Sequence, residues 1–152
     1  AAAWKAKARD LFIGWNAASR QQHLTRLTNN TRFLVLPWVR IPHLASHVLS
    51  QVSHRLCADW LEKYGHSIEL LETFVDRDRF RGTCYRAAGW QHVGATTGRS
   101  RNDADNTLRV PVKDIYVRAL TTDFRRRLCA PACSLPEGLS ACGHAQAGSA
   151  GR

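Results

Sequence analysis

Tyr85 opens the hexapeptide Tyr-Arg-Ala-Ala-Gly-Trp that ends at Trp90, in a predicted short helix followed by a strand. A tyrosine hydroxyl is a group that can take part in proton transfer. The same side chain can instead pack against a sheet, with its hydroxyl hydrogen-bonded locally. The apolar stretch 32–38 offers no general base, and Glu69 and Glu72 are the alternative bases on the next apolar segment. The sequence therefore leaves both interpretations of Tyr85 open.

A second candidate site lies at residues 39–45, where an apolar stretch leads into a strongly periodic helix. A helix N-terminus presents free backbone N–H groups and favours anions such as phosphate. Arg40 would add charge-assisted hydrogen bonds, whereas Pro42 lacks an N–H donor. An ordinary helix start is the alternative. The candidate residues for binding a phosphorylated cofactor are Val39, Arg40, His43, Leu44 and Ala45.

The chain is strongly basic, with a formal net charge of +10 over 152 residues. Residues 77–128 hold twelve Lys or Arg against five acids, whereas residues 41–76 hold two against five. Such an excess favours polyanions, and no segment resembles a recognition helix, so we expect weak, sequence-independent, salt-sensitive binding of nucleic acid. A solvated arginine-rich surface is the alternative. The basic set comprises Arg77, Arg79, Arg81 and Arg86 together with the candidate contacts Arg99, Arg101, Lys113, Arg125, Arg126 and Arg127.

Neither the histidines nor the cysteines predict a metal site. His43 and His47 have the i, i+4 spacing of helical metal ligands but no third ligand with matching spacing. The tail residues Cys129, Cys133, Cys142 and His144 match no standard zinc module. An odd count of five cysteines without a C-x-x-C pair indicates a reducing, cytoplasmic setting. No apolar run approaches the roughly 18 residues of a membrane helix, so no membrane partner is expected.

The periodicity of the sequence predicts an α/β (α+β) fold. Residues 43–63 carry the strongest helical pattern, and Tyr64-Gly65 is a typical helix end. Together with its flanking apolar runs, this helix predicts a βαβ crossover over residues 32–75, with strands 32–38 and 68–75 as parallel neighbours. Trp38 and Trp90 are expected in the core. The further predicted elements are strands 9–15, 90–97 and 112–120, helices 16–29, 79–88 and 121–128, and a loop over 98–109.

The composition divides the chain into two parts. Residues 1–128 are expected to form one domain, and residues 129–152 a disordered tail rich in small residues.

The order of these elements resembles the second half of a GNAT-type acyltransferase. Tyr85-Arg86-Ala87-Ala88-Gly89-Trp90 is similar to that family's Tyr-x-x-x-Gly-Phe, and Ala45 matches the last small residue of its R-x-x-G-x-G/A turn, although the glycines are absent. The resemblance implies a GNAT-like mixed sheet that is incomplete at the N-terminus. It also implies an acyl-CoA cofactor and a general-acid role for Tyr85.

Longer blocks resemble the family of Druantia anti-phage protein A, which also occurs beside transposases on mobile elements. These blocks are NNTRFLVLPWVRIPHLASHVL, LLETFVDRDRFRGTCYRAAGW, VGATTGR and KDIYV, and the resemblance covers residues 9–128. Members of that family carry a further N-terminal part with a His-His-Tyr-Leu-Gly block, so the resemblance implies a chain truncated at that end. It also implies other defence or transposition proteins as partners.

Two functions from different classes follow. One is a non-catalytic module of a phage-defence or mobile-element protein that contacts nucleic acid. The alternative is an acyl-CoA-dependent N-acyltransferase.

Overall fold

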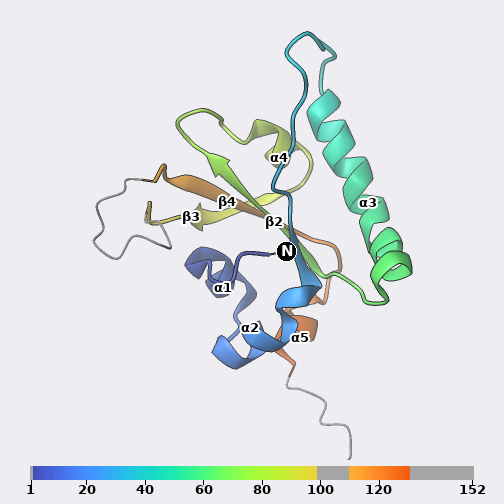
Figure 1. Cartoon of the computed structure of the whole chain (residues 1–152), viewed down its shortest axis with the longest axis vertical. Coiled ribbons are helices and arrows are strands. Elements are labelled where there is room, and N and C mark those ends of the chain that lie inside the picture. The colour runs from blue at the N-terminus through green and yellow to red at the C-terminus, as the bar shows by residue number, and fades with distance from the viewer. Residues whose placement is uncertain (1, 99–109, 131–152) are drawn as a thin grey trace, which may run out of the picture.

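The computed structural model describes residues 2–98 and 110–130 (Figure 1). The predicted loop 98–109 and tail 129–152 therefore lie outside the described residues, apart from their first members. In chain order the elements are α1 (Lys7–Ile13), α2 (Ala17–His23), the 3-10 helix η1 (Leu24–Arg26), β1 (Leu27–Asn29), α3 (Leu44–Tyr64), β2 (Leu70–Asp76), α4 (Thr83–Ala87), β3 (Gln91–Ala95), β4 (Lys113–Ala119) and α5 (Phe124–Cys129).

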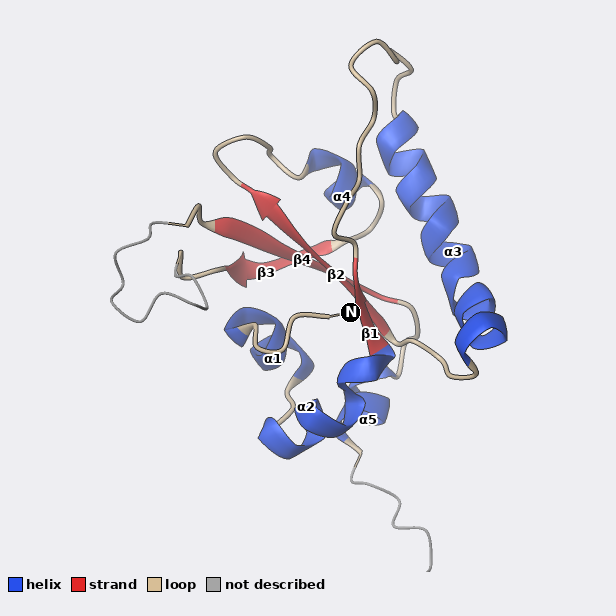
Figure 2. Cartoon of the chain, viewed as in Figure 1, coloured by secondary structure: helices blue, strands red, loops and turns tan. Residues whose placement is uncertain are grey.

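The four strands form one mixed sheet in the order β1-β2-β4-β3 (Figure 2). β1 pairs in parallel with β2, and β4 pairs antiparallel with both β2 and β3. The parallel pair is joined through α3, so the chain contains a βαβ crossover. The mixed sheet and its helices confirm the predicted α/β (α+β) class.

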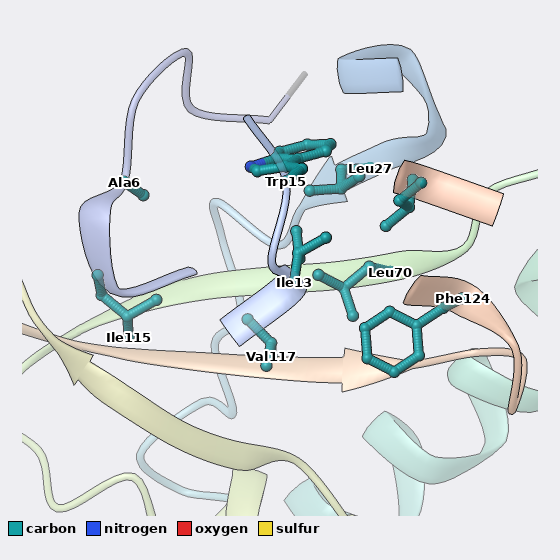
Figure 3. Close-up of a cluster of buried hydrophobic side chains, with 9 residues drawn as sticks. Ala6, Ile13, Trp15, Leu27, Leu70, Ile115, Val117 and Phe124 are labelled. Carbon is teal, nitrogen blue, oxygen red and sulfur yellow. The ribbon is translucent and has the colours of Figure 1, made fainter. Parts of the chain in front are cut away.

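The sheet separates two hydrophobic clusters, because successive side chains of a strand point to opposite faces. On one face, Leu70 of β2 and Val117 of β4 pack with Ile13 of α1 and Phe124 of α5 (Figure 3). On the other face, Leu71 and Val75 of β2 pack with residues of α3 and α4. Helices α1, α2 and α5 thus cover one face of the sheet, and α3 and α4 lie on the other (Figure 1).

α3 confirms the strongest sequence prediction, because it spans Leu44–Tyr64 where residues 43–63 were expected. It begins after His43, whose φ is 59°, and ends at Gly65, whose φ is 72° and whose N–H donates to the carbonyl of Leu61. Leu49 and Ser53 are its only fully buried residues. Most of this long helix therefore faces solvent beside the sheet (Figure 1).

The prediction of a strand over residues 9–15 is wrong. These residues lie mostly in α1, where Arg9 and Ile13 are buried one helical turn apart. Gly14 closes the helix with a φ of 86° and donates its N–H to the Asp10 carbonyl. The apolar run was therefore one face of a short helix, with Leu11 on the exposed side.

The predicted strand 32–38 is also wrong, and with it the pairing of that segment with 68–75. The strand that pairs in parallel with β2 is β1, which lies within the predicted helix 16–29. Residues 30–43 are irregular, and Leu34 and Trp38 are 77% and 74% exposed. Their apolar character therefore does not reflect burial in a sheet, and Trp38 is not a core residue.

The remaining predicted elements are confirmed in shortened form. Strand 68–75 corresponds to β2, 90–97 to β3 and 112–120 to β4. Helix 79–88 shrinks to α4, and 121–128 becomes α5. Asn16 caps α2 as expected, since its side chain accepts a hydrogen bond from the Ser19 N–H at 2.8 Å.

Candidate functional site: the α4 side of the sheet

Tyr85 of α4 is 8% exposed and belongs to the cluster beneath α3. Its ring contacts those of Phe33, Trp90 and Tyr116. Its hydroxyl accepts a hydrogen bond from Asn30 Nδ2 at 3.3 Å. Burial raises the pKa of Tyr85, and a hydrogen bond with Thr73 acts in the opposite direction. This environment matches the packing interpretation, whereas catalysis by Tyr85 stays a prediction.

Both alternative bases are engaged in ion pairs, Glu72 on the opposite face of the sheet and Glu69 directly before β2. Glu72 is fully buried, and its carboxylate accepts hydrogen bonds from Arg9 Nη1 at 2.7 Å and from the Ala3 N–H at 2.6 Å. Glu69, also fully buried, accepts hydrogen bonds from Thr121 and Arg127. Neither carboxylate forms a hydrogen bond with Tyr85 in the part of the chain that the structure describes.

The turn at residues 39–45 stands at the start of α3, away from the sheet (Figure 1). Arg40 and His43 are exposed, whereas Val39, Leu44 and Ala45 are half-buried. The Leu44 N–H donates to the Ile41 carbonyl, and the His43 side chain makes no capping hydrogen bond. The cofactor assignment stays a prediction for these five residues.

The predicted nucleic-acid contacts do not gather in one place. Arg126 and Arg127 of α5 both form ion pairs with Asp123, and Arg127 also reaches Glu69. The Arg125 guanidinium lies 4.6 Å from the ring centroids of both Phe12 and Phe124.

Lys113 begins β4, the strand whose far end leads to α5. It lines a cavity of about 460 Å³ with Asn30 and Thr31. Arg99 and Arg101 lie outside the described residues.

A different group of arginines lies on α4 and in the turn that leads to it from β2. Arg79, Arg81 and Arg86 are exposed and form no ion pair with any carboxylate of the described residues. Arg86 Nη2 donates to the Arg81 carbonyl at 3.2 Å, which brings the two residues together. Arg118 of β4 donates to the Ala88 carbonyl at the end of the same helix.

Residues 30–43 add to this basic surface, because they run beside α4 (Figure 1). Phe33 contacts Tyr85 edge-on, with ring centroids 6.3 Å apart, so the exposed Arg32 lies near α4. Residues 30–58 contain three arginines and three histidines but no acid. We call Arg32, Arg79, Arg81 and Arg86 the basic face.

An exposed aromatic side chain accompanies these arginines. Phe80 is 57% exposed beneath the Arg79 guanidinium, at 5.4 Å from ring centroid to carbon. Cations interleaved with exposed rings are typical of surfaces that bind single-stranded nucleic acid. The charge of residues 77–86 was visible in the sequence, but the contribution of Arg32 was hidden by the wrong assignment of a buried strand.

Among residues 2–98 and 110–130, no three metal-ligating side chains gather into a possible metal site. His43 and His47 are both exposed at the start of α3, and the tail cysteines beyond Cys129 lie outside those ranges. No helix in this part of the chain has the length and apolar character needed to cross a membrane.

The comparison with known protein families identifies a family that covers most of the chain. A family model described as Druantia protein DruA matches residues 1–125. No curated protein and no solved structure matches the chain, so the likeness to GNAT acyltransferases stays a prediction. The family match includes the blocks that carried the resemblance in the sequence and the whole of the basic face. The chain therefore belongs to the Druantia protein DruA family.

Proposed function

We propose that this chain serves in anti-phage defence as a non-catalytic module that contacts nucleic acid through the basic face. Family membership supports the role in defence rather than in transposition. Other defence proteins are the expected partners. The observation that carries the contact with nucleic acid is that Arg79 and Arg81 in the turn before α4 and Arg86 on α4 are exposed and have no ion-pairing carboxylate among the described residues.

The absence of ion pairs at these arginines matters, because a guanidinium that is already paired with a carboxylate contributes less free energy when it binds a phosphate. Arg126 and Arg127 would have to give up Asp123, and Arg127 would leave the buried carboxylate of Glu69 with fewer partners. Arg79, Arg81 and Arg86 have no such competitor among the described residues. Phosphate contacts need only charge, so we expect binding without sequence preference.

Aromatic side chains on the same surface favour unpaired strands. A base can stack on any exposed ring, and such stacking contributes about 1–3 kcal/mol per base. Phe80 lies between two arginines of the basic face, which places a stacking surface next to phosphate-binding groups. We therefore expect single-stranded DNA to bind more tightly than a duplex of the same sequence.

The test compares three variants for binding to a fluorescently labelled single strand at low salt. The first variant removes three of the four arginines of the basic face (Arg79→Ala, Arg81→Ala, Arg86→Ala), and the second removes Arg125 and Arg126 of α5. The third replaces Lys5, Lys7 and Lys63, which are exposed and change the net charge as much as the first variant does.

Only the first variant is expected to lose most of its affinity. A loss of affinity confined to the second variant would place the binding site on α5. An equal loss of affinity in the first and third variants would show that net charge alone determines binding. Binding that is absent in wild type at low salt would remove the proposal.

A further inference from the structure

β1 lies at one edge of the sheet, so one side of this strand has no neighbouring strand among the described residues. Asn30 directs its backbone toward β2, because its N–H donates to the Glu72 carbonyl at 2.8 Å and its carbonyl accepts a hydrogen bond from Thr73 Oγ1 at 3.0 Å. Backbone groups of successive residues in an extended chain alternate between the two edges. Those of Asn29 and Thr31 therefore point to the free edge, where unpaired groups form a template for another strand.

The segment 31–36 continues from β1 and projects beyond the sheet before α3 begins (Figure 2). Up to Val35, its backbone forms no hydrogen bond with another described residue. Exposure alternates along the segment, since Phe33 and Val35 are half-buried, whereas Leu34 and Leu36 are 77% and 42% exposed. A period of two is that of an extended strand. The segment therefore alternates like a strand but lacks a partner strand.

Both sides of this segment are apolar, although only one side is packed. Phe33 packs against the cluster that contains Tyr85, whereas Leu34 on the opposite side meets solvent. Continuous apolar runs are typical of strands that are covered on both faces. The segment thus has the composition of a strand whose second face is covered on binding.

A cavity of about 350 Å³ beside β1 provides room for the side chains of an added strand. Asn29 of β1 lines it, together with Val52 and Trp60 of α3 and with Trp90 before β3. More than half of its lining side chains are hydrophobic. In strand addition, backbone hydrogen bonds supply affinity and pockets for alternate side chains supply specificity. The free edge and the cavity together offer both.

The charges at the ends of the apolar run define the partner. Arg32 and Arg40 bound this run, and both are exposed and form no ion pair with a carboxylate of the described residues. Residues 30–58 contain three arginines and three histidines but no acid. An apolar segment bounded by Asp or Glu matches both features, because opposite charges on paired strands attract.

A second copy of this chain fits this surface less well. In register, antiparallel pairing of residues 32–40 with themselves would place Arg32 opposite Arg40, and parallel pairing would place each arginine opposite itself, which is destabilising. A lipid surface also fits less well, since unpaired backbone groups are costly in the hydrocarbon core. Leu34 and Leu36 offer no bond to a phosphate, so the surface differs from the contact with nucleic acid proposed above.

We propose that the free edge of β1 and the segment 31–36 bind one extended segment of a partner protein, which adds a strand to the sheet. The partner's segment carries alternating apolar residues between terminal Asp or Glu side chains. The test contains no nucleic acid, so this proposal and the proposed function can each fail while the other holds.

Synthetic peptides test the proposal on the wild-type chain. The probe is an eight-residue peptide in which Val and Thr alternate between acidic ends. One control peptide has Lys at both ends, and another carries N-methyl groups along its length, which remove its backbone donors. Only the acid-ended peptide is expected to slow amide hydrogen exchange at Asn29 and Thr31, measured by NMR, in a saturable manner. Unchanged exchange at millimolar peptide, or an equal effect of either control peptide, would overturn the proposal.

Variants at exposed positions locate the binding surface without disturbing the core. Leu34→Gln is expected to weaken binding of the acid-ended peptide about tenfold or more, because it removes an apolar contact. Leu11→Gln is the matched control, since Leu11 is 72% exposed on α1, and should leave binding unchanged. Arg40→Glu should reverse the preference, so that the Lys-ended peptide binds more tightly. Equal affinities of the Leu34→Gln and Leu11→Gln proteins would contradict the placement of the partner.

Two further measurements identify other occupants. A wild-type dimer in analytical ultracentrifugation that Leu34→Gln dissociates would assign the surface to a second copy and reject the partner strand. Co-sedimentation with phosphatidylcholine–phosphatidylserine vesicles that Leu34→Gln abolishes would assign it to a membrane, with the same consequence. A monomer that binds the acid-ended peptide and not the vesicles is the expected result.

Discussion

Replacing Arg9 by Met is expected to destabilise the fold strongly, because it leaves the Glu72 carboxylate buried without its cation. Both side chains are 0% exposed, and Arg9 Nη1 lies 2.7 Å from Glu72 Oε2. The same guanidinium donates to the Ala3 carbonyl and to Asp10, and lies 5.5 Å from the Trp15 ring centroid. Arg9 thus ties the N-terminal segment and α1 to the central strand β2.

The size of the effect follows from this burial. Removing one member of a buried ion pair costs about 3–5 kcal/mol, out of the roughly 5–15 kcal/mol that stabilises a domain of this kind. With a urea m value of about 2 kcal/mol/M, the unfolding midpoint should fall by about 1.5–2.5 M. Urea unfolding followed by circular dichroism measures this shift.

Two further variants test the reasoning. The double variant Arg9→Met with Glu72→Leu removes both charges and should recover most of the lost stability. Arg55→Ala breaks an exposed pair in which the side chains are 77% and 51% exposed, and should change stability by less than about 0.5 kcal/mol. An Arg9→Met midpoint within the error of the Arg55→Ala midpoint would refute the structural role assigned to the buried pair.

Three other predictions concern glycine, pH and cofactor. Gly65→Ala and Gly82→Ala both place a side chain at positive φ, which costs about 1 kcal/mol. At Gly82 the new Cβ would also lie 2.5 Å from the Tyr116 ring, whereas at Gly65 it meets nothing within 4 Å, so thermal unfolding should show a clearly larger loss for Gly82→Ala. A hydrogen bond from Arg77 holds the pKa of Asp114 below its usual range, with His92 adding to the effect. This lowered pKa stabilises the fold at pH values above about 4 and its contribution is lost as the pH falls through the folded-state pKa, so Asp114→Asn should make urea stability less sensitive to acid. If residues 39–45 bind acyl-CoA, the ligand should raise the melting temperature and Arg40→Ala should abolish the rise, whereas a folded protein that shows no rise at millimolar ligand would reject the acyltransferase alternative.

Local sequence patterns were sufficient to predict a helix or strand whose periodicity and end signals lie within its own residues. The i, i+4 apolar steps of α3 and the following Gly65 predicted a helix within one residue of its actual ends. β2 and β4 were equally visible, because both are buried on two faces and read as apolar runs.

The errors arose where apolar residues are not buried as in a sheet. Residues 32–38 have the composition of a central strand, yet Leu34 and Trp38 face solvent. The apolar run around Leu11 and Ile13 was likewise taken for a strand, although it lies in α1. Its neighbour Arg9 is buried through an ion pair with Glu72, which is 63 positions away in the sequence. Such long-range pairing leaves no mark in local periodicity.

The candidate site was also predictable only in its local features and not in its long-range contacts. The sequence displayed Arg79, Arg81 and Arg86 as a run of charge, and α4 groups Arg81 with Arg86. It could not show that Arg126 and Arg127 are occupied by Asp123 and Glu69. It also could not reveal the cavity, because Asn29, Trp60 and Trp90 come from three separate parts of the chain.

The salt dependence of DNA binding tests the central claim most directly. For wild type, the logarithm of the affinity for a duplex should fall linearly with the logarithm of the salt concentration, through counterion release. Removing Arg79, Arg81 and Arg86 together should make this slope shallower by up to about 2.7, since each phosphate contact contributes about 0.9. The control variant that removes Lys5, Lys7 and Lys63 should keep the wild-type slope. A basic-face variant whose slope equals that of wild type would contradict the assignment of nucleic-acid contact to the α4 side of the sheet.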